Sequence, residues 1–360
     1  MDNSGKISRN NTFIGKLENK LPEGAFGITY KATQNGRTVV IKKPLPIHFK
    51  IPQLMAKFNR EMQYHAQLSH PNIVELLEGN YNPSDASSCY IILEWINQGD
   101  LLGFLIRKNV LSNDEIKLIL RDIAHGLEYL HNKNYLHRDL KPENVVIQQN
   151  QSGLQAKICD FGEIKELHHS EESFRDIHLS GTANYIAFES LTELIYSRKS
   201  DVYAFGLIAF FMAAQSIPFD SYENSNDVCK AIRRKEILEI PNSVPEELTL
   251  LIKNCYSHDP MQRLFISEAL QYKFFRSQEE KDLPLANETL SQERSSKPSM
   301  VEISLEAVTE ETSKNVYNPL TSKTKLSFFN SRSPSSESED STLCCPCLVK
   351  PMLLNHPPNG

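Results

Sequence analysis

The most specific string in this sequence is His137-Arg-Asp-Leu-Lys-Pro-Glu-Asn144. It gathers a carboxylate, an ammonium and an amide within six residues, at Asp139, Lys141 and Asn144. Sixteen residues after Asn144 comes the triplet Asp160-Phe-Gly162. Such a triplet occurs often by chance, but at this spacing after the full eight-residue string it becomes informative. The two motifs therefore point to parts of one site.

Two further motifs lie towards the N-terminus. Leu21-Pro-Glu-Gly-Ala-Phe-Gly27 stands between strand-like runs, and its glycines let backbone N–H groups approach a ligand closely. Fifteen residues after Gly27, the strand-like Val39-Val-Ile-Lys42 ends on a lysine, and Glu61 follows in a helical stretch. Taken singly, the first motif is more often a tight hairpin turn, and a strand lysine is more often simply solvated. The presence of both Lys42 and Glu61 favours the functional interpretation.

In this order and spacing the four motifs resemble the signature set of the eukaryotic-type protein kinase superfamily, in its serine/threonine form. The resemblance covers about residues 13–276. It implies a bilobal α+β fold with a small β-rich N-lobe at 13–94, which carries one main helix. A larger, mainly helical C-lobe is expected at 95–276. Residues 1–12 and 277–360 are expected to be disordered.

The apolar pattern agrees with that division. Strand-like runs fill the chain up to about residue 94, interrupted by one helical stretch near Phe58 to Leu68. Helical spacing follows from Asn113 to Leu130 and from Asp201 to Ala214. Ser112 or Asn113 is placed to cap the first of these two helices. The sequence thus predicts a sheet with one helix, followed by a helical lobe.

The resemblance implies transfer of the γ-phosphoryl group of Mg-ATP to a serine or threonine hydroxyl of a protein substrate. Asp139 would orient and deprotonate the acceptor hydroxyl, and Lys141 would balance charge on the transferring phosphate. Asn144 and Asp160 would hold Mg²⁺. Lys141 also favours serine or threonine as the acceptor, because tyrosine kinases of the superfamily usually carry another pattern there.

The nucleotide would be held by the N-lobe and by the segment that links the lobes. Lys42 would reach the α and β phosphates while paired with Glu61. The gatekeeper would be Leu93, followed by a hinge that offers backbone hydrogen bonds to adenine. The full set of expected ATP contacts is Leu21, Gly24, Gly27, Thr29, Val40, Lys42, Glu94, Ile96, Asp100 and Val146.

The segment from Gly181 to Glu189 resembles the end of the family's activation segment. Thr182 would bond Asp139 or Lys141 beside the docked substrate. In the family an arginine such as Arg138 pairs with an activation-loop phosphate. The candidate phosphorylation sites are Ser170, Ser173 and Ser180, whereas Glu171 and Glu172 could supply negative charge without modification.

Two positions with implied structural roles accompany the site. Asp201 would accept backbone N–H bonds from the catalytic loop, and Arg263 would pair with Glu189. The chain departs from the family pattern at Pro22, Thr29, Glu163 and Phe188. Pro22, Thr29 and Phe188 keep open the alternative of a pseudokinase, a binding scaffold without phosphoryl transfer. A small-molecule kinase of similar fold is disfavoured by the form of the catalytic loop.

Composition excludes several other classes of protein. The 360 residues carry a formal charge of -6, which gives no broad basic surface for nucleic acid. The longest apolar run, Phe205 to Ala214, is too short for a transmembrane segment. The polar N-terminus lacks a secretory signal. Seven cysteines without a regular framework favour a reducing cytoplasm over disulfides.

The tail carries the remaining motifs. Residues 277–360 contain 21 Ser or Thr among 84 residues, with 12 acidic against 8 basic side chains. Near its end, Cys344, Cys345 and Cys347 lie between apolar residues, a pattern more typical of S-palmitoylation than of a zinc site. Lipidation would give reversible membrane association. The acidic, Ser-rich run from Ser331 to Thr342 is open to three interpretations: a solvated spacer, a phosphorylation target or a secretion signal. Together with the low glycine content, this acidic run resembles kinases that bacterial pathogens export, which implies secretion into a host cell as an alternative location.

Overall fold

The N-terminal part of the molecule is a sheet of six strands with one helix against it. The computed structural model describes residues 7–8, 16–21, 27–151, 153–168 and 171–276. The strand order is β1-β5-β6-β4-β3-β2, antiparallel except for β1, which lies parallel to β5. The strands are β1 Ile7–Ser8, β2 Lys16–Lys20, β3 Ile28–Gln34, β4 Arg37–Lys43, β5 Leu76–Asn80 and β6 Tyr90–Glu94. Disorder was expected for residues 1–12, but Ile7 and Ser8 pair with β5.

The helix of this lobe begins and ends earlier than the sequence pattern predicts. Helix α1 runs over Pro52–His65 rather than Phe58–Leu68. Pro52 occupies the first turn, where its missing N–H costs nothing, and its fixed φ favours the helix. Met55 is buried against the sheet together with Phe58 and Met62, so the apolar face begins about a turn before Phe58. The expected helix exists, but its boundaries were wrong.

The second lobe is mainly helical, as expected. Its helices are α2 Leu101–Lys108, α3 Asn113–Asn132, α4 Phe188–Glu193, α5 Arg198–Ala214, α6 Ser225–Arg233, α7 Glu246–Tyr256 and α8 Ile266–Ala269. Its short strands are β7 Tyr135–Leu136, β8 Val145–Asn150, β9 Gly153–Ile158, β10 Lys165–Glu166, β11 Ser173–Arg175 and β12 Ile195–Ser197. Single 3₁₀ turns lie at Pro46–Lys50, Ala86–Ser88, Pro142–Asn144, Ala183–Tyr185, Pro260–Gln262 and Lys273–Phe275. The bilobal α+β fold is confirmed.

Side-chain caps define where the two long helices begin. Of the two predicted caps, Ser112 is the one that caps α3, and it also exchanges bonds with Glu115 in a capping box. Helix α5 begins at Arg198, three residues before the predicted start at Asp201, because Ser197 caps it. Asp201 therefore lies in the first turn of α5.

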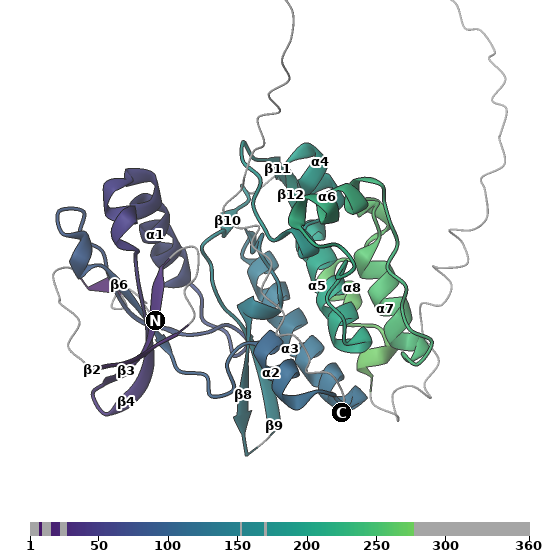
Figure 1. Ribbon diagram of the computed structural model, residues 1–360, viewed down its shortest axis with the longest axis horizontal. Coiled ribbons are helices and arrows are strands. Elements are labelled where there is room, and N and C mark those ends of the chain that lie inside the picture. The colour runs from purple at the N-terminus through teal and green to yellow at the C-terminus, as the bar shows by residue number, and fades with distance from the viewer. Residues whose placement is uncertain (1–6, 9–15, 22–26, 152, 169–170, 277–360) are drawn as a thin grey trace, which may run out of the picture. The chain divides into compact units, whose positions relative to one another are not determined.

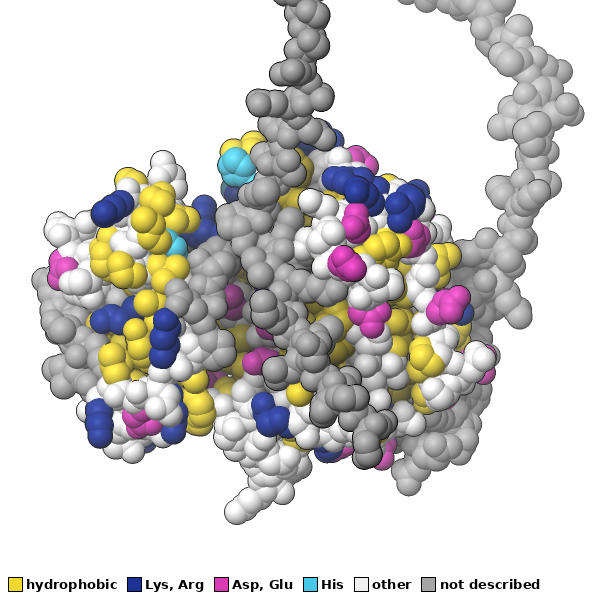
Figure 2. Space-filling model, viewed as in Figure 1, with side chains coloured by type: hydrophobic (Ala, Val, Ile, Leu, Met, Phe, Trp, Pro, Cys, Tyr) yellow, Lys and Arg dark blue, Asp and Glu magenta, His cyan; other side chains and the backbone are white. Residues whose placement is uncertain are grey.

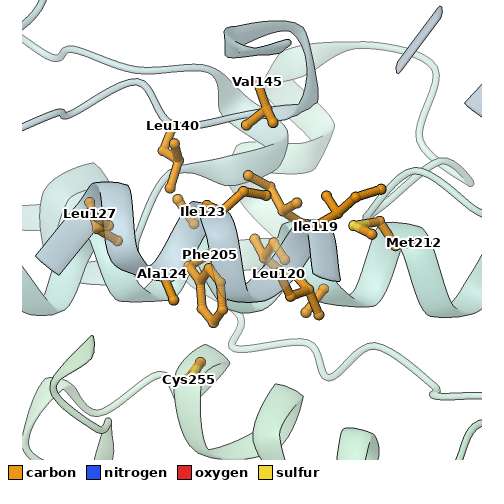
Figure 3. Close-up of a cluster of buried hydrophobic side chains, with 14 of the residues drawn as sticks. Ile119, Leu120, Ile123, Ala124, Leu127, Leu140, Val145, Phe205, Met212 and Cys255 are labelled. Atoms are coloured by element: carbon orange, nitrogen blue, oxygen red, sulfur yellow. The ribbon is translucent and has the colours of Figure 1, made fainter. Parts of the chain in front are cut away.

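Helices α3 and α5 lie side by side and supply the main core (Figure 1). Figure 3 shows Leu140, within the catalytic loop His137 to Asn144, and Val145, directly after it, pointing towards Ile123 and Ile119 of α3. Leu140 is 2% exposed and Val145 is fully buried. Burial of these two side chains ties the loop between them to the core. Packing of Leu140 and Val145 in the core thus positions the polar residues of the loop.

The hairpin of β8 and β9 brings the two chemistry-bearing motifs together. Val145 pairs with Ile158 in the antiparallel ladder. The N–H of Cys159 then donates to the carbonyl of Asn144 at 2.9 Å. Asn144 and Asp160 therefore lie at the same end of this hairpin, although 16 residues separate them in the chain.

Charge on the surface is mixed. Figure 2 shows Lys and Arg interspersed with Asp and Glu on the face in view. Within the described part of the chain, the helices are all too short or too polar to cross a membrane. The cysteines described there, Cys89, Cys159, Cys229 and Cys255, are all free thiols.

Candidate active site

A lysine from the sheet joins the two lobes. Lys42 on β4 donates to Glu61 of α1 at 2.6 Å and to Asp160 at 3.0 Å. The expected ion pair of Lys42 with Glu61 is present. Burial opposes ionisation of Asp160, but the charge of Lys42 outweighs it and lowers the pKa of Asp160 to about 2. Asp160 is therefore an anion at neutral pH, as a cation-binding carboxylate must be.

The catalytic loop forms a network around Asp139, which is 8% exposed. Lys141 donates to one Asp139 oxygen at 2.8 Å and to the hydroxyl of Thr182 at 2.8 Å. Thr182 donates to the other Asp139 oxygen at 2.7 Å. Both expected contacts of Thr182 are present. The network holds a carboxylate, an ammonium and a hydroxyl within reach of one reacting group.

The backbone of the catalytic loop is anchored by Asp201 of α5. Asp201 accepts the N–H groups of His137 and Arg138, each at 2.9 Å, and a bond from His131 at 3.0 Å. Arg138 has a φ of 70°, in the left-handed region that a non-glycine residue rarely adopts. Strain of this kind persists only where surrounding bonds enforce it. The expected role of Asp201 as an N–H acceptor is confirmed.

The residues expected to hold Mg²⁺ fit that ion chemically. The amide nitrogen of Asn144 donates to the Asp139 carbonyl at 2.7 Å, which leaves the amide oxygen for a cation. Asp160 supplies an ionised carboxylate at the same end of the β8–β9 hairpin. Mg²⁺ prefers such oxygen ligands and usually completes its shell with water and substrate phosphates.

Four of the expected adenine contacts present half-buried apolar or hydroxyl-bearing side chains. These are Leu21, Thr29, Val40 and Val146. Gly27 is buried, and an added Cβ would meet the Lys43 carbonyl at 2.5 Å, so packing alone requires glycine there. Gly24 and Pro22 lie outside the described residues.

The hinge residues are partly engaged within the protein. The N–H of Glu94 donates to the Glu75 carbonyl at 3.0 Å, and the Glu94 side chain pairs with Lys157 at 2.6 Å. That N–H is therefore not available to adenine. Ile96 is buried, and Asp100 caps α2 by accepting the N–H of Gly103 at 2.8 Å. The expected ribose contact of Asp100 would use its second oxygen.

Arg138 has an anionic partner that the sequence did not indicate. Its guanidinium donates to the carboxylate of Asp176, and to the Ser180 hydroxyl at 2.7 Å. It also lies over the rings of Tyr196 and Phe174, at 4.4 and 5.2 Å from their centroids. Burial opposes ionisation of Asp176, but the charge of Arg138 outweighs it and lowers the pKa of the carboxyl. Asp176 and Ser180, both from the segment after Asp160, thus converge on Arg138.

The expected regulatory residues lie in different environments. Ser173 is exposed on β11, Ser180 is buried with its hydroxyl bonded to Arg138, and Ser170 lies outside the described residues. Glu171 and Glu172 are exposed, and the acid that meets Arg138 is Asp176. No local signal marks Asp176, because the pairing of β11 with β12 is what carries it to Arg138.

Glu189 and Phe188, at the start of α4, both contact side chains from later in the chain. Arg263 pairs with Glu189 through two bonds, at 2.6 and 2.7 Å, as expected. Phe188, which replaces a family proline, packs edge-on against His258 at 6.3 Å between ring centroids. The nitrogen of Lys235 lies 4.7 Å from the Phe188 ring. Phe188, the first residue of α4, therefore packs against the side chains of His258 and Lys235.

Comparison with known proteins places this site in a family. The family described as "Protein kinase domain" matches residues 16–275. The chain belongs to that protein kinase family. The match covers all the described residues discussed above, from Lys42 to Arg263.

Three curated relatives illustrate the similarity. A probable serine/threonine-protein kinase of Dictyostelium discoideum is 33% identical over 71% of this chain and 27% of its own length. Serine/threonine-protein kinase PLK4 of Xenopus tropicalis is 32% identical over 72% of this chain and 27% of its own length. Aurora kinase B of Mus musculus is 28% identical over 73% of this chain and 74% of its own length. The chain thus spans about a quarter of the first two relatives.

Proposed function

We propose that this protein kinase transfers the γ-phosphoryl group of Mg-ATP to serine or threonine hydroxyls of protein substrates. The observation that carries the proposal is the network in which Lys141 and Thr182 hold Asp139 from both sides. The intact chain of Lys42, Glu61 and Asp160 supports it. A relative in Arabidopsis thaliana is named a serine/threonine/tyrosine-protein kinase, so the acceptor must be tested directly.

The residues present would act mainly by positioning and by electrostatic stabilisation. Asp139 would accept the proton of the acceptor hydroxyl, and Lys141 would stabilise charge that develops on the phosphoryl oxygens. Lys42 would hold the α and β phosphates. Asn144 and Asp160 would hold Mg²⁺, which when bound would neutralise the negative charge of the phosphates.

The test compares the wild-type protein with Asp139→Asn. Each is incubated with labelled ATP, Mg²⁺ and a generic protein acceptor, and phosphoamino acids are then identified. We expect label on serine or threonine, and a rate for the variant lower by roughly 10²–10⁴-fold, the range for loss of a general base. Incorporation no higher than in the variant would reject the proposal.

If no phosphoryl transfer is found, a measurement of nucleotide binding tests the pseudokinase alternative. Mg-ATP should raise the Tm of both the wild type and Asp139→Asn, since Asp139 is not assigned to the nucleotide. Binding without transfer would establish the pseudokinase alternative, which Pro22, Thr29 and Phe188 motivate. Label on tyrosine would retain the kinase activity but reject the proposed acceptor.

We also propose a cytoplasmic protein that associates with membranes through lipidated Cys344, Cys345 and Cys347. These cysteines lie outside the described residues, so their sequence context is the support. Changing all three to serine should release the protein from the membrane fraction of cells. Unchanged membrane association would contradict lipid anchorage at this cluster. Export into a host cell remains the alternative location and would be tested by a secretion assay.

A further inference from the structure

Glu163 follows directly after the Asp160-Phe-Gly162 triplet and is a departure that the proposed reaction does not use. Its carboxylate pairs with the ammonium of Lys57 on α1. The two side chains are only 11% and 21% exposed. The contact spans 106 residues of sequence, so no local constraint of the chain produces it.

Lys57 lies four residues before Glu61 on α1. Side chains at this spacing share one face of a helix, about 6 Å apart along its axis. The same face therefore makes two ionic contacts of opposite sense. Glu61 is the anion that meets Lys42 and, through it, Asp160, whereas Lys57 is the cation that meets Glu163. Two separated contacts restrain the helix more than either contact alone would.

Aromatic packing lies beside these contacts. Phe161 is fully buried, and its ring meets His65 of α1 edge-on at 4.7 Å between centroids. On its other side it meets His137 of the catalytic loop at 5.6 Å. Burial of Phe161 favours contact between α1 and the triplet. Aromatic packing of this kind does not determine which charged side chains of the two segments pair with one another.

Glu163 is also joined to the catalytic loop. Its backbone carbonyl accepts a bond from Arg138 at 3.4 Å, and Arg138 pairs with Asp176. A single residue thus contacts α1 through its side chain and the loop of Asp139 through its backbone. Movement of α1 would therefore displace Glu163, at the start of the segment that follows Asp160.

We propose that Glu163 is a positioning residue whose ion pair with Lys57 holds α1 where Glu61 meets Lys42. This inference deepens the proposed function and rests on it for its kinetic readout. Loss of either side chain would remove this ion pair between two largely buried groups, and with it the contact that joins α1 to the residue after the triplet. Helix α1 would then spend less time in the position that orders Lys42 for the nucleotide phosphates.

The first experiment compares Glu163→Gln and Lys57→Met with the matched controls Glu166→Gln and Arg60→Met, which remove exposed charges from β10 and α1. We expect each test variant to lower kcat/KM for ATP by about three- to ten-fold, with a higher KM for ATP and an unchanged KM for the acceptor. The double variant should lose no more than either single one. A smaller folded fraction would lower kcat without changing the KM for ATP. Kinetics equal to those of the controls would overturn the proposal.

A second measurement does not depend on catalysis. Hydrogen exchange of the α1 amides should be faster in both test variants than in both controls, with α3 and α5 unchanged. The exchanged pair, Lys57→Glu with Glu163→Lys, should restore slow exchange and ATP kinetics relative to either charge reversal alone. Absence of that recovery, or faster exchange throughout the protein, would overturn the proposal. If the wild type transfers no phosphate, the proposed function fails while α1 exchange still tests the ion pair.

Discussion

The carboxylate of Asp176 accepts a hydrogen bond from the guanidinium of Arg138, the residue directly before Asp139. The Arg138 side chain is 6% exposed, so its charge requires a partner. In many kinases such a partner is a phosphate, but a carboxylate of this chain is already in contact here. Arg138 therefore has an anionic partner without any modification of the chain, although phosphorylation at Ser170, Ser173 or Ser180 stays a prediction.

The Asp176 contact predicts activity without phosphate. Asp176→Asn should lower kcat by about three- to ten-fold, because it leaves the charge of Arg138 uncompensated. Asp176→Glu should recover part of the loss, and Glu172→Gln, which changes an exposed acid nearby, should have no effect. Mass spectrometry of the wild type should find an active fraction without phosphate between residues 163 and 189. Activity that depends wholly on phosphate there would contradict this interpretation.

The hydroxyl of Thr182 should matter more than its shape. Thr182→Val keeps the side-chain volume but removes a donor to Asp139 and an acceptor from Lys141. Because a bond to a charged group contributes about 1.5–3 kcal/mol, we expect kcat to fall by about ten-fold or more. Thr182→Ser should stay near the wild type. Equal rates for the valine and serine variants would show that the hydroxyl has no role in transfer.

Asp201 should give the fold a pH dependence of known sign. Burial opposes its ionisation, but bonds and charge from His131 and the loop N–H groups outweigh it, so its pKa lies below 3.8. A lowered folded-state pKa stabilises the protein above about pH 4, and the contribution is lost as pH falls through that pKa. Asp201→Asn should reduce the free energy of unfolding by about 2–4 kcal/mol at neutral pH. Urea titrations should find this difference constant above about pH 5 and smaller near pH 3; growth on acidification would contradict the assignment.

Gly206 marks the closest approach of α5 to α7. A Cβ added there would lie 2.8 Å from the Cβ of Cys255 and 3.0 Å from the nitrogen of Tyr256. Gly206→Ala should therefore lower the free energy of unfolding by about 1–3 kcal/mol, through overpacking. The matched control is Gly103→Ala in α2, where the nearest atom is the movable end of Arg107, at 3.1 Å. Urea unfolding that ranks the control as the less stable variant would contradict this account.

Much of the site could be predicted because its parts are short strings. The residues from His137 to Asn144 are covalent neighbours, so their spacing already limits where Asp139, Lys141 and Asn144 can lie. Ser112 could be predicted as a cap from local chemistry. The start of α1 at Pro52 was missed, because its apolar face is clear only once Met55 is seen against the sheet. Element type follows from periodicity, whereas boundaries depend on tertiary contacts.

The sequence by itself determined the family, the bilobal fold and the identity of the charged groups around Asp139. The tertiary structure decided which of those groups meet across long separations of chain. Lys42 reaches Asp160 over 118 residues, Lys57 reaches Glu163 over 106, and Arg138 reaches its acid over 38. The physical reason is that spacing within a motif is fixed by covalent bonds. Contact between segments instead depends on packing, which only the folded chain specifies.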